Sequence, residues 1–151
     1  MDAKETRGET NVSLVGLVAV LVAVGAMAID HLVGTSRSDE DGGLADPGTF
    51  AISVVLSLAA AAVLFGWFVP RERYRGPERA ARSGLVCSVL SVVPGVALIW
   101  LGIPFIVAGA GLALGLEGRF GTRRVEGSVA VTIGALALVL GAVAYLIAAV
   151  R

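Results

Sequence analysis

The chain has 151 residues, of which 56% are apolar and 16% are charged, and its mean hydropathy is +0.86. A typical soluble domain has about 25% charged residues, and a domain of this size keeps too much of its chain near the surface to hide so many apolar side chains. The composition therefore all but excludes a soluble globule, and it also argues against disorder. The formal net charge is zero, so no overall field attracts nucleic acid and we expect no nucleic-acid partner.

Charged residues divide the chain into four apolar runs, which span residues 12–29, 49–69, 83–116 and 128–150. A helix needs about 20 apolar residues to cross a hydrocarbon core about 30 Å thick, so the first, second and fourth runs each suit one crossing. None of the runs shows the alternation that marks the strands of a membrane β-barrel. The pattern therefore predicts an all-α integral membrane bundle, whose first partner is the lipid bilayer.

The third run is too long for one crossing, because a single helix over it would measure about 51 Å. We predict two helices, about 83–99 and 104–117, joined by a turn at Trp100–Pro104. Gly102 relaxes the backbone there, and Pro104 ends a preceding helix. The alternative is four crossings, with the break at Pro94-Gly95 and with residues 83–93 re-entrant or interfacial.

The distribution of basic residues favours five crossings. With a cytoplasmic N-terminus, five crossings place ten of the 12 lysines and arginines on the inner side, and four crossings place only eight there. Five crossings also put Trp100 at the outer interface, where tryptophan is enriched. The C-terminus is then extracytoplasmic, and we expect the chain in the cell membrane.

The predicted organisation is a cytoplasmic tail and one membrane domain, residues 1–11 and 12–150. The expected helices span about 12–29, 49–69, 83–99, 104–117 and 128–150. An acidic outer loop (30–48) and two basic inner loops (70–82 and 118–127) connect them. Residues 12–28 also resemble a signal peptide with a cleavage site at Ala26-Met27-Ala28, so cleavage of residues 1–28 stays open. The acidic residues Asp2, Glu5 and Glu9 argue against it.

Small residues recur at spacings of three and four along most of the apolar runs. Such rows let the backbones of membrane helices approach closely. The strongest packing candidates are Gly111, Gly115, Ala130, Gly134, Ala137 and Gly141. We interpret these rows as contacts between the chain's own helices, with a homo-oligomer or another membrane protein as the alternative partner.

The predicted inner loop at residues 70–82 is rich in arginine, and arginine beside a membrane attracts anionic headgroups. We expect five arginines to lie at the inner face in contact with lipid: Arg71, Arg73, Arg75, Arg79 and Arg82.

The chain lacks the residue patterns of a catalytic site. No charged residue lies inside any of the four apolar runs, although transporters and pumps generally carry one at mid-membrane. The single histidine, His31, and the single cysteine, Cys87, fall on opposite sides of the membrane. We expect no catalytic residues, no metal and no cofactor. The sequence favours a non-enzymatic structural or accessory subunit, and the alternative is a small transporter or channel component.

The second half of the chain carries a loose series of glycine motifs: Gly84-Leu-Val, Pro94-Gly95, Gly111-Leu-Ala-Leu-Gly115, an arginine-rich turn, Gly127-Ser-Val-Ala130 and Gly134. Over residues 80–150 it resembles a group of small bacterial multi-pass membrane proteins of unknown function. The resemblance implies an apolar hairpin, a short basic loop and a final helix, and it implies no activity. This chain departs from the group at Glu117 and Glu126, and by the two helices in front.

Overall fold

The computed structural model describes residues 3–36, 46–92 and 102–150, with side chains described over 13–33, 46–92 and 102–147. Its helical elements are α1 (Ala3–Ser36), α2 (Pro47–Val63), η2 (Leu64–Phe68), α3 (Val69–Tyr74), α4 (Pro77–Val92), α6 (Ile103–Gly118) and α7 (Arg124–Val150). Because α2, η2 and α3 are one continuous helix, these elements form five helices. The prediction of an all-α chain with five helices is confirmed for the described residues.

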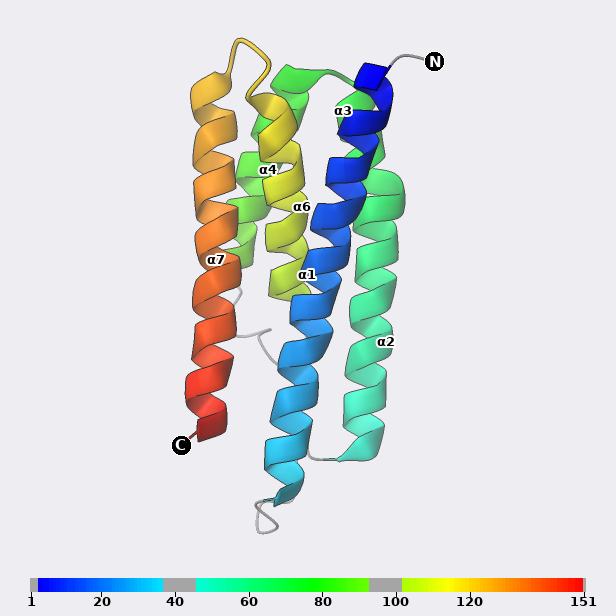
Figure 1. Ribbon diagram of the computed structural model, residues 1–151, viewed down its shortest axis with the longest axis vertical. Helices are drawn as coiled ribbons and strands as arrows, with labels where there is room; N and C mark the ends of the chain where they lie inside the picture. Colours follow the sequence, from blue (N-terminus) through cyan, green and yellow to red (C-terminus); the bar gives the residue numbers. More distant parts are fainter. Residues whose placement is uncertain (1–2, 37–45, 93–101, 151) are drawn as a thin grey trace.

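The five helices run alongside one another, and each reverses the direction of the one before it in the chain (Figure 1). One end of the bundle gathers α3, the start of α4, the end of α6 and the start of α7. We call residues 69–82 and 117–127 the arginine end. The helices α4 and α6 occupy the part of the bundle nearest this end, whereas α1, the α2–α3 helix and α7 continue to the far end (Figure 1).

Within the described part of the chain, three helices are long and apolar enough to span a membrane: Ser13–Val33, Pro47–Tyr74 and Arg124–Ile147. The shorter apolar helix Ile103–Gly118 has 16 residues, or about 24 Å. The lengths and composition of these helices suggest membrane association.

Two helices continue beyond the charged residues that end their apolar runs. The helix α1 passes Asp30 and His31 and ends at Ser36, although its apolar run ends at residue 29. A charged residue ends an apolar run because its side chain needs water, but its backbone can still form the hydrogen bonds of a helix. Boundaries taken from hydropathy therefore fall short of the backbone boundaries.

The second helix passes through Pro70, where its apolar run ends. Pro70 has no N–H to donate, and its ring crowds the carbonyl one turn earlier. The preceding residues form a π-helical turn, in which the Val69 N–H donates to the carbonyl of Leu64, five residues back. The wider turn accommodates the proline, and the helix reaches Tyr74.

The helices α4 and α7 begin earlier than the apolar runs that they contain. Gly76 has φ 104°, which permits the tight turn after α3, and Pro77 opens α4 with its φ already helical. The first turns of α4 and α7 contain Glu78 and Glu126, whose negative charges interact favourably with the positive end of the helix dipole. The predicted basic loop at 70–82 is thus largely helical, whereas the loop at 118–127 keeps a turn over residues 119–123.

The predicted hairpin is described on both of its arms. The helices α4 and α6 are antiparallel neighbours (Figure 1). Gly102 adopts φ 64° immediately before α6. The rival break at Pro94-Gly95 lies outside the described residues, as do residues 100–101 of the predicted turn and residues 37–45 of the predicted outer loop. The last two residues of the predicted turn, Ile103 and Pro104, belong to α6.

Asp46 caps the start of α2. Its Oδ2 accepts the Thr49 backbone N–H at 2.7 Å and the Thr49 hydroxyl at 3.0 Å. These bonds favour the carboxylate, so they lower the pKa of Asp46 below its usual value.

Candidate functional site

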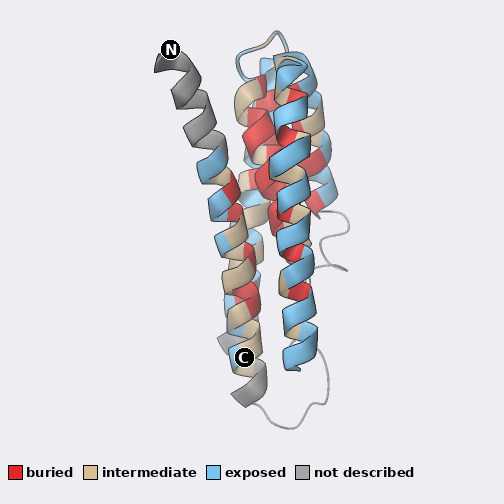
Figure 2. Ribbon diagram, turned by 90° about the vertical axis from the view of Figure 1, so that its right-hand side faces the viewer, coloured by how far each residue is buried: buried red, intermediate tan, exposed pale blue. Residues whose placement is uncertain are grey.

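Most large apolar side chains lie on the outside of the bundle, and most of the buried residues are small, although Met27, Ile106 and Leu114 are fully buried. Leu17, Val55 and Leu140 are 60%, 64% and 63% exposed, whereas Ala110 and Ala130 are fully buried. Figure 2 shows buried residues along the inner faces of the helices and exposed residues along the outer faces. Soluble proteins preferentially bury their large aliphatic residues. The outer surface therefore suits hydrocarbon as its solvent.

The closest approach to backbone atoms in the described part joins α4 to α6. A methyl group at Gly84 would lie 2.8 Å from the backbone nitrogen of Gly115 and 3.0 Å from the carbonyl oxygen of Gly111. A methyl group at Gly118 would lie 2.6 Å from the Cα of Ala81. The two backbones touch along α4, and a larger side chain at any of these glycines would separate them.

The helix α7 joins the same contact. A methyl group at Gly115 would meet the carbonyl oxygen of Gly127 at 2.9 Å and the Cβ of Ala130 at 3.0 Å. The buried Ser88 hydroxyl of α4 donates to the carbonyl of Ala130 at 2.8 Å, and Ser88 also lies against Gly111. We call α4, α6 and α7 the three-helix unit.

Further along α7, Gly134 packs against the α6 backbone, since a methyl group there would lie 2.9 Å from the carbonyl oxygen of Ala108. Gly141 faces the ring of Phe105, which also lies 5.8 Å, between ring centroids, from Tyr145. Ala137 is half-buried. Five of the six packing candidates thus lie at contacts between α6 and its neighbours, and all six belong to the three-helix unit.

The helix α1 and the α2–α3 helix pack on this unit mainly through side chains. The ring of Phe65 covers Gly16, with its Cδ1 2.9 Å from where a methyl group would be. Gly102, at the start of α6, is enclosed by the Met27 methyl group and the Ser57 hydroxyl. One closer approach exists, where Gly109 of α6 meets Ala19 of α1.

Ion pairs and hydrogen bonds organise the arginine end. Glu72 is 7% exposed, and it accepts the Ser83 hydroxyl at 2.8 Å and an Arg75 N–H at 2.7 Å. Arg73 pairs with Glu117 at 3.2 Å, which ties α3 to α6.

Two further contacts hold the turn between α6 and α7. Glu78 accepts the Thr122 hydroxyl at 2.5 Å, and Arg123 pairs with Glu126.

The five arginines predicted to contact lipid fall into two groups. Arg73 and Arg75 are held in the ion pairs just described. Arg71, Arg79 and Arg82 are exposed and form no ion pair among the described residues. The Arg71 guanidinium lies over the ring of Trp67, 5.0 Å from its centroid. The prediction of lipid contact therefore rests on the second group.

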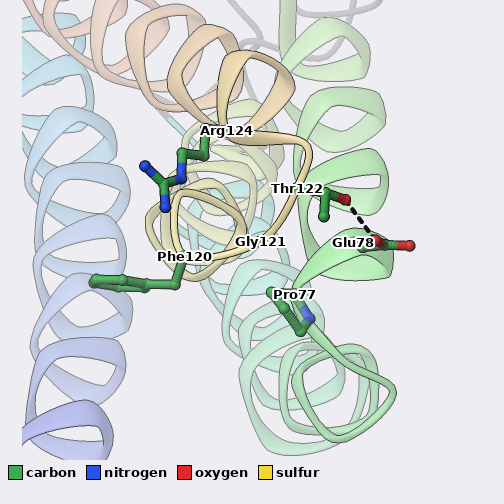
Figure 3. Close-up of a pocket in the computed structure, with 6 residues that line it drawn as sticks. All are labelled: Pro77, Glu78, Phe120, Gly121, Thr122 and Arg124. Atoms are coloured by element: carbon green, nitrogen blue, oxygen red, sulfur yellow. Dashed lines mark hydrogen bonds between the residues drawn. The ribbon is translucent and has the colours of Figure 1, made fainter.

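An open pocket of about 350 Å³ lies between the start of α4 and the α6–α7 turn. Figure 3 shows Glu78 and Thr122 facing each other at one edge, with Phe120 and Arg124 at the other. The remaining lining residues are Pro77 and Gly121. Over the described residues, no group of three His, Cys, Asp or Glu side chains is placed to hold a metal.

Sequence reasoning did not single out Glu72, because its partner Ser83 is eleven residues away and meets it only through the turn at Gly76. It also did not include Gly109 among the packing candidates. The spacing of small residues could have indicated Gly109, which lies in the same glycine-rich segment as Gly111.

No protein family, curated protein or solved structure matches this chain. The resemblance of residues 80–150 to small bacterial membrane proteins stays a prediction.

Proposed function

We propose that this chain is a multi-pass integral membrane protein that acts as a non-enzymatic structural or accessory subunit through helix packing. The observation that carries the proposal is the distribution of side-chain size, with most large apolar residues exposed and with alanine, glycine and serine making up most of the buried residues. Packing through small residues is how helices associate in lipid, where apolar burial supplies no driving force between helices.

We place the arginine end in the cytoplasm and the chain in the cell membrane. The arginine end carries eight of the chain's arginines and lysines, and basic residues near span ends accumulate on the cytoplasmic side. The N-terminus of α1 lies at this same end (Figure 1), so it is cytoplasmic as well. With five crossings the C-terminus is extracytoplasmic.

Five crossings remain the leading topology, and four crossings remain the alternative. The apolar part of α4 in the described residues, 83–92, measures only about 15 Å, which is half of a hydrocarbon core. Reporter fusions after Arg124 and after Arg151 separate the two. An inside signal at the first and an outside signal at the second supports five crossings, and the reverse supports four.

Fractionation tests the membrane assignment itself. We expect the untagged chain to sediment with membranes and to stay there after alkaline carbonate washing. Recovery in the supernatant after ultracentrifugation without detergent would contradict the proposal.

The subunit role predicts a partner, either a second copy or another membrane protein, and no cofactor. Crosslinking in native membranes tests this role. A defined adduct that is weakened by bulky substitutions on an exposed helix face, and not by substitutions at the arginine end, supports it.

A small transporter or channel component is the second candidate. It is favoured by the start of α6, where Gly102 is buried within the bundle beside Met27 and Ser57. Helices that begin inside a bundle recur at the binding sites of transporters. Flux assays in liposomes separate the candidates, because saturable or selective flux would contradict a purely structural role.

A further inference from the structure

The arginine end has an excess of positive charge that its own acids do not neutralise. It contains eight arginines and four glutamates, which leaves a net charge of +4. All four glutamates are engaged within the arginine end: Glu72 by Arg75 and Ser83, Glu78 by Thr122, Glu117 by Arg73, and Glu126 by Arg123. The acids thus all have partners within this end, and three of them are paired with Arg73, Arg75 and Arg123.

Five arginines of this end form no ion pair with any described residue, and all five are exposed. They are Arg71, Arg79, Arg82, Arg119 and Arg124, which we call the open arginines. They come from α3, from the first two turns of α4, from the α6–α7 turn and from the start of α7, so four segments of this end contribute to them.

Exposed aromatic side chains lie among the open arginines. Trp67, Tyr74 and Phe120 are 59%, 96% and 82% exposed. Aromatic residues are enriched at the level of the lipid headgroups. Their position implies that the open arginines lie at the depth of the lipid phosphates, where Arg71 is already held over the ring of Trp67.

We propose that the open arginines form a binding surface for anionic phospholipid headgroups. A guanidinium group binds phosphate through paired N–H donors. It is also more weakly hydrated than the ammonium group of lysine, so it loses its water more readily. The net positive charge favours anionic lipid over zwitterionic lipid. The surface adds Arg119 and Arg124 to the contacts predicted from sequence, and it leaves out Arg73 and Arg75. This inference rests on the proposed membrane location.

Quenching by brominated lipids tests the surface directly. The chain has two tryptophans, so Phe120→Trp with Trp67→Phe and Trp100→Phe gives a single reporter beside Arg119 and Arg124. The purified protein is reconstituted with brominated phosphatidylglycerol or brominated phosphatidylcholine, and the relative association constant of the two lipids is measured. Each nearby arginine is expected to raise the preference for phosphatidylglycerol about fivefold.

Three variants of the reporter protein show whether the preference depends on Arg119 and Arg124, on their positive charge, or on an ion pair of the same end. Arg119→Gln with Arg124→Gln is expected to reduce the preference at least fivefold, and the matched Arg119→Lys with Arg124→Lys is expected to keep most of it. Arg73→Gln with Glu117→Gln removes an ion pair of the same end without changing its net charge, and it should leave the preference unchanged.

Each outcome decides a different question. Equal association of the two lipids, or a preference that survives Arg119→Gln with Arg124→Gln, would overturn the anionic-lipid surface. Absence of quenching by either brominated lipid would instead overturn the membrane location. As a control, the same arginine substitutions are made in a second protein that keeps Trp67 and carries Trp100→Phe. Quenching of Trp67 there checks that the substituted proteins are still inserted.

Discussion

The three-helix unit and the two N-terminal helices are packed by different atoms. In the three-helix unit, a methyl group at Gly84 would meet the backbone nitrogen of Gly115 at 2.8 Å. On α1, a methyl group at Gly16 would meet the ring of Phe65 at 2.9 Å. The distances are similar, but a ring can turn about its side-chain bonds, whereas a backbone moves only with its whole helix.

This difference predicts that the two regions tolerate change unequally. Contacts between backbones gain dispersion energy from many atom pairs at once. A larger side chain at one position separates the two helices, so the energy of all these pairs is lost. Contacts through Phe65 and Met27 leave room for adjustment. The N-terminal helices should therefore accept substitutions that the three-helix unit does not.

The largest effect is expected from Gly84→Leu. The new side chain would push α4 away from α6. Overpacking of this kind lowers stability by about 3 kcal/mol at the upper end of its usual range. The matched control is Gly25→Leu on α1, because nothing lies within 4 Å of a methyl group at Gly25. The free energy of unfolding in detergent micelles measures both. Equal losses in the two variants would contradict the proposed difference in packing.

Glu72→Ala should have the next largest effect, because Glu72 links α3 to the three-helix unit. The change removes the acceptor of the Ser83 hydroxyl and the partner of Arg75. Hydrogen bonds to a charged group contribute about 1.5–3 kcal/mol, so we expect a loss of about 2 kcal/mol. Glu78→Ala, which removes an exposed acceptor, is the control. A loss no greater than that of Glu78→Ala would show that Glu72 does not link the two regions.

Alanine substitutions at Gly134 and Gly16 compare the regions with the smallest possible change. Gly134→Ala should cost about 1 kcal/mol, because the methyl group would lie 2.9 Å from the carbonyl oxygen of Ala108. Gly16→Ala should be neutral or stabilising, since the Phe65 ring can move aside and alanine favours helix by up to about 1 kcal/mol. Thermal unfolding of the two variants side by side gives the comparison. The opposite ranking would refute the account of how the N-terminal helices pack.

The smallest effect is expected from Ser88→Ala, which deletes the hydrogen bond from α4 to the carbonyl of Ala130. Polar contacts between membrane helices contribute about 0.6 kcal/mol on average, so the loss should be of this size. Thr132→Ala is the control, because the Thr132 hydroxyl is exposed and donates within its own helix. Unfolding measurements that show no difference between these variants would mean that the packing of the three helices does not depend on this bond.

Hydropathy predicted the order of the helices, because apolar runs of about 20 residues have few alternatives to a helix in lipid. The number of five followed only when the excess length of the third run and its turn residues were added. It did not predict where the helices end. Pro70 lies inside a helix because a π-helical turn accommodates it, and Pro77 begins a helix before the apolar run starts. Both outcomes depend on backbone hydrogen bonding, to which hydropathy is insensitive.

The packing candidates show the same division. Spacing indicated Gly111, Gly115 and Gly134, because small residues three or four apart share one helix face. Spacing cannot say which helix lies opposite, so the joint contact of Gly84, Gly115 and Gly127 emerges only from the fold. The pairing of Glu78 and Glu117 is equally invisible in sequence, since their partners are 44 residues away.

The central claim is that the exposed aliphatic side chains face lipid, and site-directed spin labelling tests it most directly. Single labels at Leu17, Val55 and Leu140, in a Cys87→Ala background, are compared with a label at Arg79. The account predicts that the three aliphatic sites collide with oxygen and are shielded from a water-soluble nickel complex, whereas the label at Arg79 collides with nickel. Nickel access at Val55 and Leu140 equal to that at Arg79 would contradict it.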